Sequence, residues 1–468
     1  MRNLILSGSI CSLLLCACAV GPDYERPKLP ELAAYPESKA ATGQPVMADW
    51  WKGFHDTDLD ALVAEALKAN TDLRIAVARV EEASAGLNEV TGAMLPQVNA
   101  GVGASRNTVS NNGYSPITSF AGRDRTSYSG GLSTAFELDF WGKLRRASEA
   151  ARAQLLSVSE ARLQVELALT ASVVRTYALV RASDIQLAAA EEIKNIRDEE
   201  YRITEERIKV GAASAHDRAQ AEVARSAAIA ALSDTRRARA QAEHLLGSLV
   251  GQPGIVLTVR PLNSLVTPPA PAVGLPSDLL RQRPDVVAAE QALVAANARI
   301  GYAKAAYFPT FSLTGALGVE SRELSSLFST GNGTSQFGLN ASVPIFDFGR
   351  TGARVEAAEA IQLQAAAAYE KAVLNAFREV RDALVDVQET DVAAEAGRRR
   401  MLASCEAYRI AEERKGLGQA SPAEFLVARR VMAESRVAIA RILLDRLGAQ
   451  VDLVKALGGA RPDLAARR

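Results

Sequence analysis

The spacing of hydrophobic residues changes its period early in the chain. From Thr57 to Asn70, apolar residues recur three and four positions apart, which indicates an amphipathic helix. A second helix is expected after Asn70, ending at about Met94 because Pro96 follows. From Val98 onward the period becomes two, which is the spacing of a half-buried strand. The first helical stripe consists of Leu59, Leu62, Val63, Ala66 and Leu67.

Two predicted strand hairpins, at about 97–140 and 310–346, carry apolar residues on one face and small or polar residues on the other. Strands of about ten residues suit a tilted membrane strand with one lipid face and one wet face. Two ordinary hairpins on a soluble core are the alternative, but the small and polar second face favours a lumen. The expected apolar face contains Val98, Ala100, Val102, Ala104, Tyr128, Leu132, Phe136, Leu138, Phe140, Phe311, Leu313, Leu317, Val319, Phe337, Leu339, Ala341, Val343 and Ile345.

Each strand hairpin is followed by a helix of unusual length. Residues 143–210 hold neither Gly nor Pro and are rich in strong helix formers. A continuous helix there would extend about 100 Å. Residues 349–415 are proline-free and form its counterpart. The shorter antiparallel helices that follow span about 215–250 and 422–457. We therefore predict that Gly211 and Gly418 form the turns of two helix hairpins.

The second half of the chain repeats the first. Tyr201–Ser214 reads YRITEERIKVGAAS, and 207 residues later Tyr408–Ser421 reads YRIAEERKGLGQAS, with nine of fourteen positions identical. A period this long exceeds a solenoid unit and indicates two copies of one module, a plan common in membrane transport. The predicted segments are a signal at 1–17, a tether at 18–57, the first repeat at 58–252, a proline-rich linker at 253–277, the second repeat at 278–458 and a tail at 459–468.

The N-terminus resembles a bacterial lipoprotein signal. Arg2 precedes an apolar run, Leu4–Leu15, which is shorter than the roughly 20 residues that a membrane helix needs. The run ends in Leu15-Cys16-Ala17-Cys18, so Cys18 is the predicted lipidation site. An ordinary secretory signal with incidental cysteines is the alternative. No other stretch is apolar enough for a membrane helix, so any membrane crossing is expected to use strands.

Charge and candidate chemistry exclude several classes of function. The 54 basic and 54 acidic residues cancel, so nothing favours nucleic acid or an anionic membrane surface as a partner. Three histidines, His55, His216 and His244, lack companions at ligand spacing, which argues against a metal site or a catalytic triad. Once Cys18 carries lipid, Cys405 has no intrachain partner, so no disulfide framework is expected. Catalytic motifs are missing from their required contexts, and we expect no enzyme activity.

Four strands are too few to close a membrane barrel. Two open edges would leave unpaired backbone groups in hydrocarbon, each costing several kcal/mol. Bacterial barrels begin at about eight strands, so several copies of the chain would have to share one barrel. The expected fold is therefore mainly helical with membrane strands, and its pooled helices would form a hollow cylinder that conducts. A non-conducting envelope scaffold is the alternative, but a scaffold does not explain strand pairs at matching points of both repeats.

Six motifs occur together along the chain: Cys18–Pro27, Trp50-Trp51, Glu137–Lys143, Leu279–Val286, Ala295–Gly301 and Phe346–Arg350. In combination they resemble the lipoprotein (NodT-type, OprM-like) branch of the TolC-like outer-membrane efflux proteins, over essentially the whole chain after the signal. The resemblance implies a homotrimer with a twelve-strand barrel and a twelve-helix periplasmic tunnel, and no catalytic residue or cofactor. It also implies two partners, a periplasmic adaptor and an inner-membrane pump, often of the resistance-nodulation-division class.

The resemblance places a periplasmic gate at the turns of the helix hairpins. Family members close that end with an iris of helix hairpins that carry acidic rings. Asp217 falls at an acidic position of the first hairpin, and Glu424 at an acidic aperture position of the second, close to Gln419 and Ala423. A further position that is often aspartate is Val427 here. Helix capping is an equal alternative for both carboxylates, because each lies in the first turn after a break.

Two of the motifs lie where a strand pair gives way to a long helix. The candidate junction residues are Asp139, Gly142, Asp347 and Gly349. The cargo is expected to be chosen by the pump, because a tunnel needs no tight pocket and selectivity in this family resides largely with the pump.

Overall fold

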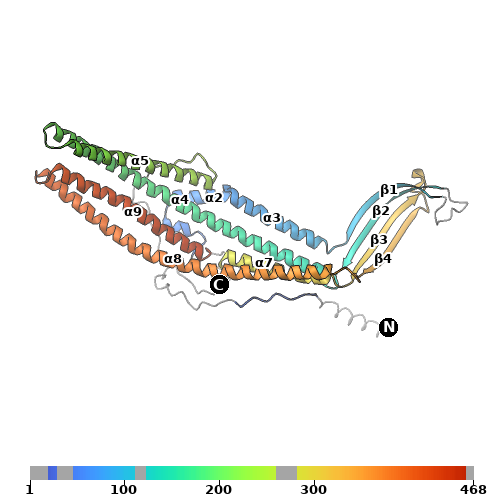
Figure 1. Ribbon diagram of the computed structural model, residues 1–468. Coiled ribbons are helices and arrows are strands. Elements are labelled where there is room, and N and C mark those ends of the chain that lie inside the picture. The colour runs from blue at the N-terminus through green and yellow to red at the C-terminus, as the bar shows by residue number, and fades with distance from the viewer. Residues whose placement is uncertain (1–18, 29–45, 111–122, 260–281, 460–468) are drawn as a thin grey trace. The chain divides into compact units, whose positions relative to one another are not determined.

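The computed structural model describes residues 19–28, 46–110, 123–259 and 282–459 (Figure 1). The predicted lipidation site, Cys18, lies outside the described residues. The elements in chain order are η2 (Trp50–Phe54), α2 (Thr57–Ala69), α3 (Thr71–Gly92), β1 (Gln97–Thr108), β2 (Asp124–Leu138), α4 (Lys143–Lys209), α5 (Ala215–Val250), α7 (Pro284–Ala305), β3 (Thr310–Ser321), η4 (Leu324–Ser326), β4 (Gly333–Ser342), α8 (Arg350–Gly416) and α9 (Pro422–Ala456). The expected fold class, mainly helical with two strand pairs, is confirmed.

The chain folds into two compact units. The first comprises Met1–Lys28, Val80–Val158 and Ala289–Tyr369, and the second comprises Leu29–Arg79, Ser159–Ala288 and Glu370–Arg468. Each repeat contributes its strands and the adjoining helix portions to the first unit and its helix hairpin to the second. The compact units therefore do not coincide with the two sequence repeats.

The first unit contains one antiparallel sheet with the strand order β1-β2-β3-β4. Strands β2 and β3 come from different repeats and pair directly, with Leu132 opposite Leu317. This pairing joins the two hairpins into one continuous sheet. Strand β1 pairs only with β2, and β4 only with β3, within the described part of the chain. The sheet is therefore open at both edges.

Ion pairs give the order of the helices in the second unit. They are Asp198–Arg225 between α4 and α5 (2.7 Å), Glu192–Arg436 between α4 and α9 (3.0 Å) and Asp391–Arg446 between α8 and α9 (2.5 Å). Figure 1 shows the same row, α5-α4-α9-α8. Helices α5 and α8 therefore lie at the two ends of the row. The long helices α4 and α8 have 67 residues each, which corresponds to about 100 Å.

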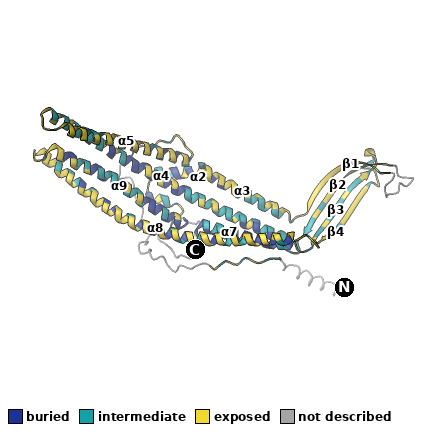
Figure 2. Ribbon diagram, viewed as in Figure 1, coloured by how far each residue is buried: buried dark blue, intermediate teal, exposed yellow. Residues whose placement is uncertain are grey.

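The main hydrophobic core lies in the second unit, where α2 packs against α4, α5 and α9. Four of the five residues in the first helical stripe of the sequence are buried in it, and the fifth, Leu67, packs against it. Figure 2 shows buried residues along these helices. The core contains Phe54, Leu59, Leu62, Val63, Ala66, Leu73, Leu169, Ala171, Val173, Val174, Tyr177, Ala178, Leu246, Val250, Leu447 and Val451.

A buried set of charges ties α4 to α5 and to the segment that follows α5. Asp184, whose side chain is 0% exposed, accepts hydrogen bonds from Arg239 Nε at 2.6 Å and from Arg181 Nη1 at 3.4 Å. The two arginines also donate to the carbonyl oxygens of Leu257 and Thr258, at 3.0 and 2.6 Å. Buried charges are tolerated when they are paired, so these contacts fix the start of the linker between the repeats.

Helix α4 differs from one expectation. The sequence analysis found no candidate membrane helix beyond the N-terminus, but an 18-residue window of α4 reaches a mean hydropathy of 1.2 and is long and apolar enough to cross a membrane. Half of that window is buried inside the protein, and the core helix of a soluble protein has the same properties. The hydropathy of α4 is therefore explained by its place in the core.

Candidate functional site

The strand register puts the expected apolar residues of all four strands on one face of the sheet. Leu132 lies between Ala100 on β1 and Leu317 on β3. Several members of this face are highly exposed, including Val102 at 94% and Phe337 at 77%, and Figure 2 shows little burial on the strands. The opposite face carries Asn99, Gly101, Ser129, Ser133, Thr314, Gly318, Gln336 and Asn340. One face therefore suits hydrocarbon and the other suits water.

At the first strand–helix junction, Asp139 and Gly142 have different tasks. The Asp139 carboxylate accepts a hydrogen bond from the backbone N–H of Arg145 at 3.0 Å, in the first turn of α4. Gly142 has a φ of 76°, and a Cβ there would lie 2.8 Å from the Cα of Ala19. Glycine is therefore required at this position both by the backbone conformation and by the close approach of the N-terminal segment.

At the second junction, Asp347 caps α8. Its carboxylate accepts from the hydroxyl of Thr351 at 2.6 Å and from the Thr351 backbone N–H at 2.8 Å. These hydrogen bonds hold the pKa of the Asp347 carboxyl below its usual range. Gly349 follows with a φ of 81°, and Phe348 between them has a φ of 56°. Both predicted junction pairs thus combine a capping carboxylate with a glycine in the left-handed region.

The two helix-hairpin turns have the same geometry in both repeats. Gly211 and Gly418 take φ values of 71° and 70°, a conformation that favours glycine. In each turn an arginine side chain donates to a backbone carbonyl oxygen five residues later, at 3.1 Å. The two bonds are Arg207 to Ala212 and Arg414 to Gln419. Gly211 lies between α4 and α5 and Gly418 between α8 and α9, and Gln419 follows Gly418.

Both candidate aperture carboxylates take part in capping boxes. The Ser214 hydroxyl accepts from the Asp217 backbone N–H at 3.2 Å, and the Asp217 carboxylate accepts from the Ser214 backbone N–H at 2.7 Å. Ser421 and Glu424 repeat the arrangement at 3.2 and 3.0 Å. The backbone and hydroxyl bonds from Ser214 hold the pKa of Asp217 below its usual range. Ala423 lies beside Glu424 in the first turn of α9.

Below the turns, a small apolar cluster joins the first helix hairpin to the second. Ile196 on α4 packs with Phe425 and Leu426 on α9. The ring of Tyr408 lies 5.7 Å from the ring of Phe425, and the ammonium of Lys415 lies 4.0 Å from the centre of that ring. This cluster holds the start of α9 against α4.

An ion-pair bridge adds to the contact between the two hairpins. The Glu192 carboxylate on α4 accepts from Arg429 Nε at 3.1 Å and from Arg436 Nη1 at 3.0 Å on α9. Neither Glu192 nor Phe425 was among the residues predicted from the sequence. The sequence did hold a signal for Phe425. The equivalent residue of the first repeat, 207 positions earlier, is Arg218, so the two repeats differ at the position where the two helix hairpins touch.

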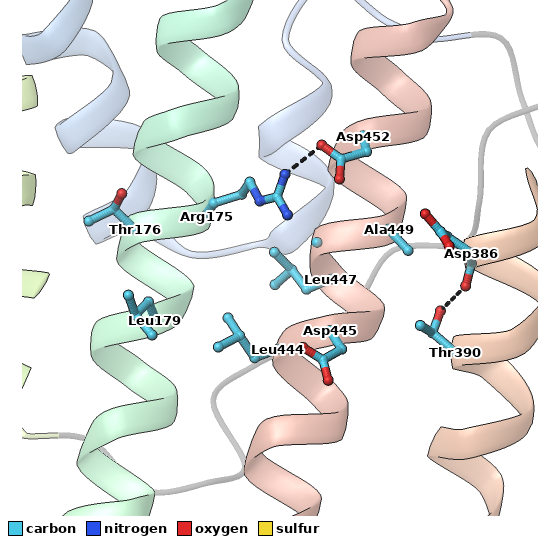
Figure 3. A pocket seen from close by; sticks show the side chains of 11 residues that line it. Arg175, Thr176, Leu179, Asp386, Thr390, Leu444, Asp445, Leu447, Ala449 and Asp452 are labelled. Carbon is cyan, nitrogen blue, oxygen red and sulfur yellow. Dashed lines mark hydrogen bonds and ion pairs between the residues drawn. The ribbon is translucent and has the colours of Figure 1, made fainter. Parts of the chain in front are cut away.

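A cleft of about 450 Å³ lies between α4, α8 and α9 (Figure 3). Arg175 spans it and donates to the Asp452 carboxylate at 2.5 Å. Gly448 makes room for this side chain, since a Cβ there would lie 3.1 Å from Arg175 Nη2. Asp386 and Asp445 also line the cleft. No group of three or more His, Cys, Asp or Glu side chains is arranged to hold a metal ion within the described residues.

Comparison with known proteins identifies the family to which this chain belongs. The family model described as "Outer membrane efflux protein" matches the chain over two segments, residues 62–252 and 275–459. The chain belongs to the outer membrane efflux protein family. It is 34% identical over 474 residues to the toluene efflux pump outer membrane protein TtgC of Pseudomonas putida, covering 98% of this chain and 96% of the relative.

Two further matches are a cation efflux system protein and a solved structure. The cation efflux system protein CusC of Escherichia coli is 33% identical over 454 residues, covering 96% of this chain and 97% of the relative. The CmeC outer membrane channel of Campylobacter jejuni matches with a TM-score of 0.86 at 25% identity, covering 96% of this chain and 98% of that chain. The protein is therefore an outer-membrane efflux channel, and members of this family transport rather than catalyse.

Proposed function

We propose that three copies of this channel form one conduit, a twelve-strand barrel continued by a twelve-helix periplasmic tunnel. The observation that carries the proposal is that the sheet and the row of helices each have two edges without a neighbouring element among the described residues. Among the described residues, the sheet ends in the unpaired edges of β1 and β4, and the helix row ends in α5 and α8. An open strand edge in hydrocarbon costs several kcal/mol for each unpaired backbone group. Neighbouring copies of the chain would close both layers at once.

An exposed apolar stripe on α8 supports the same arrangement. Four exposed residues of α8 in the second unit fall within about 20° of one another at 100° per residue. They are Leu374, Val385, Val392 and Ile410. An apolar stripe on an edge helix favours another helix as its partner. We propose that α5 of the neighbouring copy packs on this stripe of α8, because α5 lies at the other end of the row α5-α4-α9-α8.

The test of the conduit is the oligomeric state of protein extracted from outer membranes in mild detergent. Native mass spectrometry should give three times the mass of the lipidated chain. Unheated samples should migrate in SDS gels as a trimer that heating converts to monomer. A monomer that remains in the soluble periplasmic fraction would contradict the proposal.

A periplasmic adaptor is the proposed partner at the hairpin turns, and an inner-membrane pump of the resistance-nodulation-division class is the proposed source of cargo. The turns present Val210 and Leu417, which are 78% and 72% exposed, at matching positions of the two repeats. Apolar side chains on otherwise polar tips are typical of a protein contact. In cross-linked cells, Leu417→Asp should lower the amount of adaptor recovered with the channel, while Leu402→Asp on α8, away from the turn, should not.

We propose a lipid anchor on Cys18 and no other cofactor. The residues just after Cys18 are held firmly against the first unit. Val20 N–H donates to the Trp141 carbonyl at 3.0 Å, and Asn297 Nδ2 donates to the Pro22 carbonyl at 2.9 Å. Arg146 forms an ion pair with Asp23, and Arg26 with Glu290. These contacts hold the chain beside the first strand–helix junction, which is where an acyl chain on Cys18 would enter the membrane.

Gly301→Ala should release this N-terminal segment. A Cβ at Gly301 would lie 2.6 Å from the Val20 carbonyl oxygen, a distance that neither backbone can tolerate. We expect trypsin to cut after Lys28 faster in the variant, as followed by mass spectrometry of the products. Gly86→Ala is the matched control, because Gly86 is also helical and has nothing within 4 Å of the added Cβ. Equal cleavage in both variants would contradict a clamped segment.

The periplasmic aperture is proposed to be lined by Glu424 of the second helix hairpin, with Asp217 in the first hairpin and Gln419 and Ala423 near Glu424. Opening would require the α8–α9 hairpin to move between two packed arrangements under the influence of the adaptor. A ring of carboxylates in a narrow mouth attracts cations. Glu424 also caps α9, so a test must separate the effect of its negative charge on ions from its effect on the stability of the helix.

Glu424→Gln should lower the cation preference of the channel in planar bilayers without loosening α9. Glutamine can still accept the backbone bond of a capping box, so the variant removes only the charge. Ser421→Ala is the converse control: it removes the cap, at a cost of about 1 kcal/mol, and keeps the charge. Unchanged reversal potentials in Glu424→Gln, or equal changes in both variants, would leave Glu424 with a capping role alone.

The cargo class is proposed to depend on the pump. Relatives of similar identity are named for toluene and for cations, which are chemically unlike, although both cover nearly the whole chain. A polar, wide passage without a tight pocket is consistent with such a range.

A further inference from the structure

The charged residues on the polar face of the sheet lie towards its two ends. The middle of this face carries small or uncharged polar side chains, among them Gly101 and Ser133. Within the four strands, the charge on this face comes from three residues, Arg125, Glu137 and Glu320. A solute that moves along this face therefore meets fixed charge only towards the ends of the strands.

At the end of the sheet where the helices begin, the charge is neutralised within the chain. The Glu137 carboxylate, near the end of β2, accepts a hydrogen bond from Lys143 Nζ at 2.9 Å, at the start of α4. Both side chains of this ion pair are only partly exposed. The pair adds no net charge, so we expect it to have little influence on whether cations or anions pass.

The opposite end of the sheet carries positive charge without a matching carboxylate. Arg125 lies opposite Asn107, near the end of the β1–β2 hairpin, and is exposed. It forms no ion pair within the described part of the chain, and residues 111–122, which lie between the two strands in sequence, contain no Asp or Glu. Arg123 adds a second positive charge two residues away, and its Nε donates to the Val109 carbonyl oxygen at 3.2 Å.

Glu320 places a negative charge one level closer to the middle of the sheet. It lies opposite Ser129 in the β2–β3 register, and its carboxylate accepts from the Ser127 hydroxyl at 2.7 Å. Ser129 comes four residues after Arg125 on β2, a separation of about 13 Å along a strand. The Debye length is about 8 Å in physiological salt, so charges this far apart are largely screened from each other. Arg125 and Glu320 therefore form two separate charged levels rather than an ion pair.

We infer that Arg125 sets the charge preference of the extracellular mouth, where its positive charge favours anions and opposes the re-entry of cations. This end is extracellular, because the long helices that extend into the periplasm begin at the other end of the strands. A fixed charge acts strongly on ions in a water-filled passage with walls of low dielectric constant. The inference rests on the proposed conduit, in which the polar face lines the lumen. It gives the outer mouth a charge opposite to that proposed for the aperture at Glu424.

Reversal potentials of the full-length protein in planar bilayers, measured under a gradient of potassium chloride, test the inference. Arg125→Gln should lower the chloride-to-potassium permeability ratio by about twofold near 0.1 M salt, where the Debye length is about 10 Å, and by less near 1 M, where it is about 3 Å. Arg125→Lys keeps the charge and should keep the ratio of the parent protein. Glu320→Gln removes a negative charge and should raise the ratio.

Arg106→Gln is the matched control. Arg106 lies next to Asn107 on β1, so it belongs to the apolar face at nearly the same level of the sheet as Arg125. The variant loses the same charge outside the lumen, and its permeability ratio should equal that of the parent protein. An unchanged ratio in Arg125→Gln, or equal shifts in Arg125→Gln and Arg106→Gln, would overturn the inference and leave the conduit standing. A parent protein that carries no current would contradict the conduit itself, and the inference with it.

Discussion

Leu339→Arg should largely prevent the channel from reaching its folded form in the outer membrane. Leu339 lies on the apolar face of the edge strand β4 and is 67% exposed. A charged side chain on a lipid face costs about 2–4 kcal/mol near the bilayer midplane. In the proposed barrel this cost would recur in every copy. The measurement is the amount of heat-modifiable protein recovered from outer-membrane fractions.

Asn340→Arg is the matched control, because the adjacent residue points to the polar face of the same strand. We expect nearly normal recovery of this variant and an altered ion preference in planar bilayers. If the two arginine variants were recovered equally well, the assignment of lipid and water faces would be wrong.

Asp184→Asn should destabilise the second unit by about 3 kcal/mol. Removing one partner of a buried ion pair typically costs about 3–5 kcal/mol, because the remaining charge stays buried without compensation. Here Arg181 and Arg239 would both lose their shared carboxylate. The low end of the range is expected because Asp58 lies 3.5 Å from Arg181 and Glu243 lies 2.9 Å from Arg239. Thermal unfolding of the purified protein, followed by the helical circular dichroism signal, measures the loss.

Asp234→Asn provides the comparison, with an ion pair that lies within α5. Asp234 pairs with Arg237 at 2.9 Å, but both side chains are about two-thirds exposed. Exposed pairs contribute little, about 0–1 kcal/mol, so the melting temperature should hardly change. A similar shift in both variants would show that charge on α5, rather than burial of Asp184, controls stability.

The periodicity of the sequence was enough to predict the strands and the long helices. Apolar and polar residues alternate around Val98 on β1, Leu132 on β2 and Leu317 on β3. This alternation identifies the apolar face of each strand without any knowledge of strand pairing, because the side-chain period of a strand is fixed at two. The absence of Gly and Pro from residues 143–210 likewise left α4 little alternative to a continuous helix. Such local signals depend only on neighbours along the chain.

Contacts between distant segments were not predictable in the same way. Nothing near Glu192 indicates that its partners are Arg429 and Arg436, because that pairing arises only when the two helix hairpins lie side by side. The capping roles of Asp217 and Glu424 were anticipated as alternatives, since a Ser-x-x-Asp/Glu spacing is itself a local signal. Their proposed place in an aperture depends on how copies of the chain assemble.

The equal length of α4 and α8 restricts how this protein can evolve. Each turn is held by a pair of antiparallel helices, so deleting a heptad from one arm alone would shift that arm along its partner by about 10 Å and misplace the exposed side chain of the tip. Both arms of a hairpin would have to lose the same number of turns, and the other hairpin would have to follow to keep the two tips level. Changes in the length of the helix hairpins should therefore appear among homologues as four coordinated insertions or deletions, one in each of the four helices.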